Sequence, residues 1–140
     1  MIIINPYLYF NGNCEEVFNF YKDVFEVEFK YIGRYKEVPN TDKHIFQEQD
    51  NKIMHVSLPI NNQTTLMGCD NTELHKETIC SNNFSLSITT DKKEEADKLF
   101  QKLSVGGKIK LAMNETFWGS YYGIVNDKFG INWKISFETN

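Results

Sequence analysis

The sequence is poor in the residues and runs that mark several protein classes. It has three cysteines in 140 residues, none in a Cys-x-x-Cys pair, so it indicates neither a disulfide framework nor a zinc site. It has no apolar run long enough to cross a membrane and no basic-then-apolar leader, so we expect a soluble, cytoplasmic protein. The formal net charge is −4, without a cluster of Lys and Arg, which argues against nucleic acid as the main partner.

Aromatic residues are plentiful by contrast, and they are densest between residues 115 and 133, ETFWGSYYGIVNDKFGINW. The second part of this segment has the pattern of strand, turn and strand. Before it, Glu115 stands close to Trp118 and Gly119, and such a pairing of carboxylate and flat apolar surface suits the rim of a ligand cleft. A hairpin with a hydrophobic cluster at its root explains the same residues equally well.

Apolar residues spaced three and four apart predict a first helix with one buried face. They are Cys14, Val17, Phe18, Tyr21, Val24 and Phe25. Asn13 is expected to cap this helix, with Glu16 in the reciprocal position. The helix dipole could lower the pKa of Cys14, but its place on the apolar stripe favours packing. Strands are predicted at 7–10, 27–35, 52–60 and 64–69, with a long loop at 36–51.

The pattern then starts again after a polar linker. A strand at 84–88 precedes a second helix, which Asp91 is expected to cap and Gly106-Gly107 to end, and strands follow at 108–113, 121–125 and 131–137. The order strand, helix, three strands therefore occurs twice, which predicts an α+β fold built from two βαβββ modules. We expect one domain over 1–140, with modules at about 1–70 and 84–140, a linker at about 71–83, and a cleft between the paired sheets.

Three segments carry a resemblance to a known family. The runs PYLYFNGNCEEVFNFYKDVF, KIMHVSLPI and ETFWGSYYGIVNDKFGINW resemble the PhnB-like, or 3-demethylubiquinone methyltransferase-like, branch of the vicinal oxygen chelate superfamily. That superfamily includes glyoxalase, bleomycin-resistance and extradiol dioxygenase proteins. The resemblance implies paired modules in a U-shaped, partly open mixed sheet around a cleft, usually in a homodimer. Relatives usually have Gly after the first helix, where this chain has Glu26, at a cost of roughly 1 kcal/mol if that residue is left-handed.

The resemblance also implies where a divalent metal would be held in the enzymes of the superfamily, by one residue from each of four strands. These positions fall near Pro6 or Tyr7, near Leu66 or Met67, at about Ser85 and at about Lys134. None is His or Glu, and an ammonium such as that of Lys134 repels a cation. We therefore expect a degenerate site and no metal cofactor. No glycine-rich loop opens onto a helix, so S-adenosylmethionine is not expected either.

Five residues are candidates for contact with a ligand: Tyr9, His55, Glu115, Trp118 and Tyr121. His55 stands in a predicted strand, in a Met-His-Val context that resembling relatives share. Glu115 could accept a hydrogen bond or act as a general base, and it is the candidate catalytic residue. The aromatic side chains could stack on a planar ligand, although packing in the core explains them nearly as well.

Three functions follow, in this order of preference. The first is a small-molecule-binding protein whose aromatic cleft holds an organic ligand, aromatic or cationic, without transforming it. The second is a metal-dependent lyase, isomerase or dioxygenase with His55 and Glu115 as relocated ligands, which lacks at least one further ligand. The third is a non-catalytic dimeric scaffold whose cleft is filled by core residues.

Overall fold

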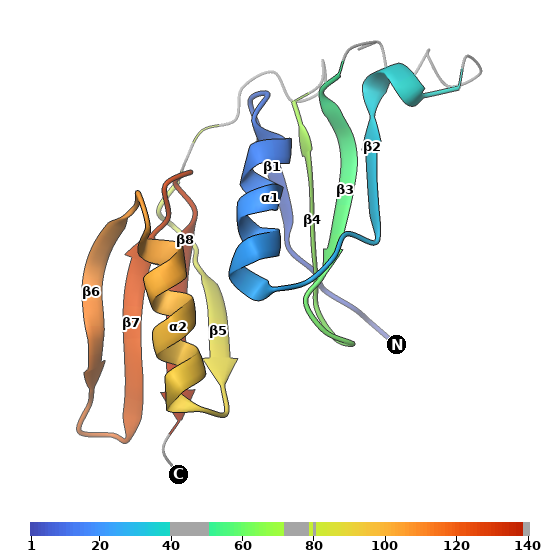
Figure 1. Cartoon of the computed structure of the whole chain (residues 1–140). Helices are drawn as coiled ribbons and strands as arrows, with labels where there is room; N and C mark the ends of the chain where they lie inside the picture. The colour runs from blue at the N-terminus through green and yellow to red at the C-terminus, as the bar shows by residue number, and fades with distance from the viewer. Residues whose placement is uncertain (40–50, 72–78, 80, 139–140) are drawn as a thin grey trace. The chain divides into compact units, whose positions relative to one another are not determined.

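Each half of the chain runs strand, helix and then three strands (Figure 1). The structure is a computed structural model, and it describes residues 1–39, 51–71, 79 and 81–138. The elements of the first half are β1 (Tyr7–Phe10), α1 (Cys14–Phe25), β2 (Tyr31–Arg34), the 3-10 helix η1 (Tyr35–Glu37), β3 (Ile53–Pro59) and β4 (Thr65–Asp70). Those of the second half are β5 (Leu86–Thr90), α2 (Lys93–Ser104), β6 (Lys108–Glu115), β7 (Ser120–Asn126) and β8 (Asn132–Glu138).

The strands form two four-stranded mixed sheets, with the orders β1-β4-β3-β2 and β5-β8-β7-β6. In each sheet the first strand pairs in parallel with the last, and the other pairs are antiparallel. Neither sheet closes into a barrel, so the predicted α+β class with two βαβββ modules is confirmed. The chain divides into two compact units, Met1–Ile79 and Cys80–Asn140. The cleft between the modules stays a prediction.

One helix covers one face of each sheet, and the core of each unit lies between them. In the first unit the buried ring of Phe18 meets Phe10 edge-on, with ring centroids 6.2 Å apart. Gly68 is required there, because an added Cβ would stand 2.6 Å from the carbonyl oxygen of Leu8. In the second unit Gly123 plays the same part opposite Phe100 of α2. Within the described residues, neither helix is long and apolar enough to span a membrane.

The two predicted helix caps are wrong. The side chain of Asn13 makes no capping hydrogen bond, and the residue before α2 is Lys92, also without one, so Asp91 stands one position too early. At α1 the cap comes from a distant carboxylate, because Asp70 Oδ1 accepts from the backbone N–H groups of Gly12 and Cys14, each at 2.9 Å. An acceptor more than fifty residues away satisfies the helix start as well as a local one.

Other local predictions have mixed outcomes. Glu26 adopts the left-handed conformation, with φ 55°, as expected for a residue in the place of glycine. The strand predicted at 27–35 is shorter, since β2 covers Tyr31–Arg34 and η1 follows it. Most of the loop predicted at 36–51 and of the linker at 71–83, including Cys80, lies outside the described residues. Cys14 packs fully buried, and burial raises the pKa of its thiol, so the dipole does not activate it.

Candidate functional site

The first unit has an aromatic surface on the face of its sheet that α1 leaves uncovered, called here the open face. Leu8 and Phe10 point toward α1, so the alternate residues Tyr7 and Tyr9 point to the open face. The strand register places Met67 and Cys69 beside these two tyrosines. The ring centroids of Tyr7 and Tyr9 lie 5.2 Å apart, and Tyr9 is 38% exposed.

His55 joins this surface from β3. Its Nδ1 lies 3.0 Å from the hydroxyl of Tyr7, and its ring lies 5.6 Å from that of Tyr7 and 6.0 Å from that of Tyr31. Tyr31 comes from the edge strand β2, where it covers Gly33. The Tyr7 hydroxyl also interacts with the buried thiol of Cys69. Phenol, imidazole and thiol therefore form a chain of polar groups in an otherwise aromatic surface.

Burial sets the protonation of these three polar groups. It raises the pKa values of the Tyr7 phenol and the Cys69 thiol, so both keep their protons at neutral pH. It lowers the pKa of His55 below the ordinary 6.5, so the imidazole is neutral at pH 7 and one ring nitrogen carries hydrogen. A neutral imidazole with one nitrogen at Tyr7 can offer the other nitrogen to a ligand.

The lowered pKa of His55 predicts a dependence of stability on pH. Because the unfolded chain takes up the proton first as the pH falls, the contribution of His55 is present above about pH 6.5 and is lost as the pH falls through the folded pKa. We expect His55→Gln to reduce the loss of unfolding free energy between pH 7.5 and pH 5.5, measured by urea denaturation. An NMR titration midpoint of His55 at or above 6.5 would contradict the assignment.

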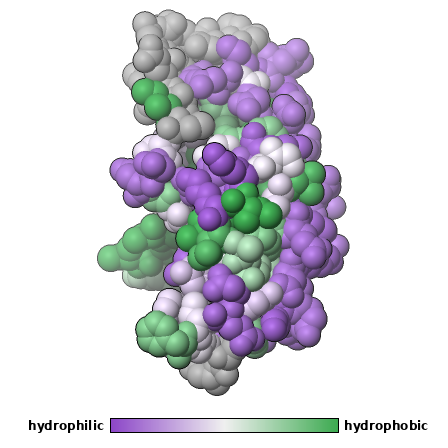
Figure 2. Space-filling model, turned by 90° about the vertical axis from the view of Figure 1, so that its left-hand side faces the viewer, coloured by the Kyte–Doolittle hydropathy of each residue, from purple (hydrophilic) through white to green (hydrophobic). Residues whose placement is uncertain are grey.

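The second unit has its own aromatic group, on the face of its sheet away from α2. Trp118 is 61% exposed and contacts Phe117 edge-on, with ring centroids 5.0 Å apart. The Trp118 ring also lies 6.2 Å from that of Tyr122, and Lys134 Nζ stands 4.9 Å from the centre of the Tyr122 ring. Figure 2 shows one face of the molecule, on which hydrophobic residues reach the surface in groups among hydrophilic ones.

Two candidate residues lie on the opposite side of this sheet, toward α2. The hydroxyl of Tyr121 donates to Asp97 Oδ1, and this bond raises the pKa of the phenol to about 12. Lys93 Nζ stands 4.5 Å from the centre of the Tyr121 ring and 3.3 Å from Glu115 Oε1. Both residues are thus bound to side chains of α2, whereas Trp118 is on the other face. The structure brings Tyr9 together with His55 in one unit and Glu115 together with Tyr121 in the other.

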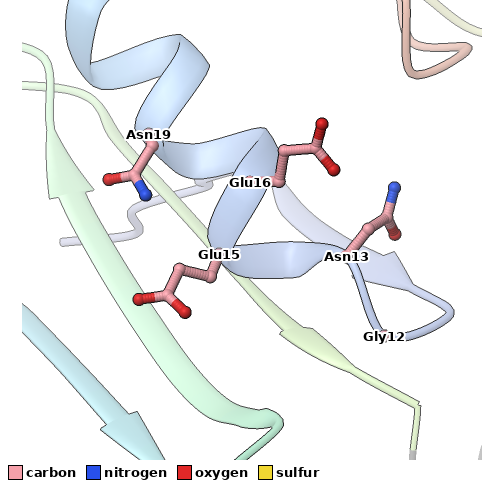
Figure 3. Close-up of a pocket in the computed structure, with 5 residues that line it drawn as sticks. All are labelled: Gly12, Asn13, Glu15, Glu16 and Asn19. Carbon is pink, nitrogen blue, oxygen red and sulfur yellow. The ribbon is translucent and has the colours of Figure 1, made fainter.

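A hollow of about 490 Å³ lies at the start of α1, lined by Gly12, Asn13, Glu15, Glu16 and Asn19 (Figure 3). Its two carboxylates point in different directions. That of Glu15 is already paired with Arg34 through contacts of 3.1 and 2.6 Å, which lower its pKa. Because the hollow is open and one of its two carboxylates is already paired, it is not the ligand site that we favour.

Comparison with known proteins gives the family. The model of the family described as 3-demethylubiquinone-9 3-methyltransferase matches residues 3–136. The chain belongs to this family. Protein YjdN of Escherichia coli K12 is 29% identical to this chain over 140 residues, which cover 95% of this chain and 93% of YjdN.

Solved structures agree with the family on the fold. Protein PA1353 from Pseudomonas aeruginosa is 30% identical, with a TM-score of 0.85 and full coverage of both chains. A PhnB protein from Bacillus cereus is 29% identical, with a TM-score of 0.76 over 96% of this chain and 98% of its own. A glyoxalase/bleomycin resistance protein/dioxygenase family enzyme from Burkholderia phytofirmans shares the fold at 15% identity, with a TM-score of 0.66 over 96% of each chain. The predicted resemblance to the PhnB-like branch is confirmed.

The metal site implied by the superfamily does not fit the side chains found here. Among the candidate positions, the Tyr7 phenol keeps its proton beside His55, Met67 offers a thioether, and Lys134 carries an ammonium. Hard divalent ions prefer carboxylate and carbonyl oxygens, and zinc prefers His and thiolate. Over the described ranges, no three side chains of His, Cys, Asp or Glu gather in a way that could hold an ion. The side chains at these positions therefore do not support a metal-dependent step in this family member.

Several residues of these two surfaces were not among the predicted ligand contacts, although Tyr7 and Lys134 were named at the implied metal positions. Tyr7 is two positions before Tyr9, so strand alternation alone could have placed it on the same face. Tyr31 could be placed only through its register with Ser57 of β3. Tyr122 and Lys134 were visible as aromatic and basic strand residues, but nothing local indicates that they contact each other.

Proposed function

We propose that this chain binds a small organic molecule, aromatic or cationic, and that the open face of the first unit provides the main contacts. The observation that supports this most directly is the hydrogen-bonded pair of Tyr7 and His55 among aromatic rings. Sites for small molecules combine an apolar, aromatic lining with a few polar groups that fix orientation. This surface has both parts.

The charge of the surface supports the same kind of ligand. The open-face residues named above are aromatic, sulfur-containing or neutral, since the imidazole of His55 is uncharged at pH 7. The π-faces of Tyr9 and Tyr31 can contact a planar ring or a cation. The net charge of −4 favours the approach of a cation over that of an anion.

The structure supports the three predicted contacts of the second unit, Trp118, Glu115 and Tyr121, to different degrees. Trp118 is exposed in the second unit, and its contact with a ligand stays a prediction. Glu115 and Tyr121 are bound to Lys93 and Asp97, which supports a structural role for them and gives no support to Glu115 as a general base. A cytoplasmic location and a homodimer remain part of the proposal, the homodimer on the resemblance alone. Methyl transfer, although it is in the family's description, is not.

A thermal-shift experiment tests the proposal with benzyltrimethylammonium and indole as probes. A bound probe at 100 times its Kd should raise the midpoint of unfolding by about 5 °C, and His55→Gln and Tyr9→Leu should abolish most of the rise. Phe84→Leu is the matched control, because it removes a half-exposed ring of the second unit and should change nothing. A rise that both His55→Gln and Tyr9→Leu retain in full, or the absence of any rise, would contradict the proposal.

Elemental analysis of the purified protein separates this proposal from the metalloenzyme. We expect no stoichiometric zinc, nickel, manganese or iron in the wild-type chain. One equivalent of metal per chain that is lost on His55→Ala would instead favour the metal-dependent lyase, isomerase or dioxygenase.

A further inference from the structure

Two neighbouring tyrosines of β7 each carry a lysine over the ring, on opposite faces of the second sheet. Lys93 Nζ lies 4.5 Å from the centre of the Tyr121 ring, and Lys134 Nζ lies 4.9 Å from that of Tyr122. The two contacts are of the same kind and nearly the same distance. What differs is the charge around them.

Lys93 has a counter-charge and Lys134 has none in the part of the chain that the structure describes. Lys93 pairs with Glu115 at 3.3 Å. No Asp or Glu carboxylate among residues 1–39, 51–71, 79 and 81–138 forms an ion pair with Lys134, whose ammonium instead makes a cation–π contact with the neutral ring of Tyr122. An ammonium over a ring uses one direction of approach and keeps N–H groups that can donate elsewhere.

Lys134 is also unusual in its position, because it lies on an inner strand of the sheet. β8 is an inner strand, between β5 and β7, and the register partners of Lys134 are Ser87 and Ile124. Inner strands usually have apolar or neutral residues, and a lysine is more common at an edge. Here a positive charge stands on the face away from α2, exposed and beside a serine.

Trp118 extends the surface next to this charge. Its ring is tilted by 36° to that of Tyr122 and lies 6.2 Å from it, and Phe117 contacts it edge-on. An exposed indole held by neighbouring rings presents a flat apolar surface at little cost in conformational entropy. Ammonium, phenol and indole thus follow one another on a single face.

We propose that Lys134, Tyr122 and Trp118 form a binding site for a small aromatic carboxylate. The carboxylate accepts hydrogen bonds from the Lys134 ammonium, and the ring of the ligand packs on Trp118 and Tyr122. Charge-assisted hydrogen bonds between ammonium and carboxylate are among the strong ones in proteins. This site goes beyond the function proposed above, because it lies in the second unit and selects the opposite charge.

Benzoate is a suitable probe, and the two tryptophans of the chain provide the readout. In a titration followed by ¹H–¹⁵N NMR, we expect the indole N–H signal of Trp118 to move. The indole of Trp133 should not move, because it is 2% exposed and donates to Asp127 Oδ2 at 2.9 Å. Benzyl alcohol, which has the ring without the charge, should bind at least about tenfold more weakly.

Two lysine variants make the test specific. Lys134→Gln should weaken the binding of benzoate about tenfold, whereas Lys93→Gln, which also removes an ammonium from a tyrosine ring of β7, should leave it unchanged. An unmoved Trp133 signal in both variants shows that the fold is intact. The proposal fails if benzoate leaves Trp118 unmoved, if benzyl alcohol binds equally well, or if the two variants weaken benzoate alike. His55→Gln should not affect this titration, which separates it from the test of the first unit.

Discussion

Replacing Asp70 by alanine is expected to lower the free energy of unfolding by about 4 kcal/mol, the largest effect of any single polar substitution that we foresee in the first unit. Asp70 is 1% exposed, and its two carboxylate oxygens accept from three backbone N–H groups, those of Gly12, Cys14 and Ile53. The carboxylate therefore joins the end of β4 to the start of α1 and to the start of β3. Without it, three donors lose their acceptor at once, and those of Cys14 and Ile53 are buried.

Urea denaturation followed by circular dichroism measures this loss. Asp91→Ala is the matched control, because Asp91 also precedes a helix but is exposed, and it makes no cap at α2. We expect the control to cost less than about 0.5 kcal/mol. Equal losses in the two variants would mean that Asp70 contributes no more than an ordinary surface carboxylate, contrary to the structure.

Asp127→Ala should cost the second unit about 3 kcal/mol of unfolding free energy. Asp127 is buried in the turn between β7 and β8, where Oδ1 accepts from the backbone N–H groups of Phe129 and Ile131 at 2.9 and 3.1 Å. Oδ2 accepts from the indole N–H of Trp133 at 2.9 Å. One carboxylate thus fixes the turn and the largest buried side chain of this unit together.

Intrinsic fluorescence is the right probe for this variant, because both tryptophans, Trp118 and Trp133, belong to the second unit. Asp127→Asn, combined with Trp133→Phe in a double-mutant cycle, separates the indole bond from the turn. We expect a coupling free energy of about 1 kcal/mol between the two positions. Additive losses would show that the indole bond does not contribute to stability.

The order of elements could be predicted from the sequence because it depends on local periodicity. The apolar spacing from Cys14 to Phe25 gave the bounds of α1, and the glycines after α2 marked its end. The helix caps could not be predicted in the same way. Nothing near Cys14 indicates that its N–H is bound by Asp70, since that contact exists only when β4 lies beside β1.

The face of a strand on which a candidate residue lies could not be predicted from local sequence either. Tyr121 and Tyr122 are adjacent and identical, so hydrophobic alternation cannot decide which one points toward the helix. The decision comes from Gly123, where a side chain would collide with Phe100, and this places Tyr121 beside α2 and Tyr122 on the other face. His55 could be singled out as a polar residue in an apolar strand, but its hydrogen-bond partner Tyr7 comes from a different strand.

The parallel pairing of first and last strands has a consequence for the synthesis of the chain. β1 is an edge strand whose one neighbour in its sheet is β4, and β5 has the same relation to β8. On the ribosome, β1 therefore has no hydrogen-bonding neighbour in its sheet until residues 65–70 have left the exit tunnel, and β5 has none until residues 132–138 have done so. Translation thus sets two successive moments of completion, one for each unit, and the second falls at the very end of the described chain.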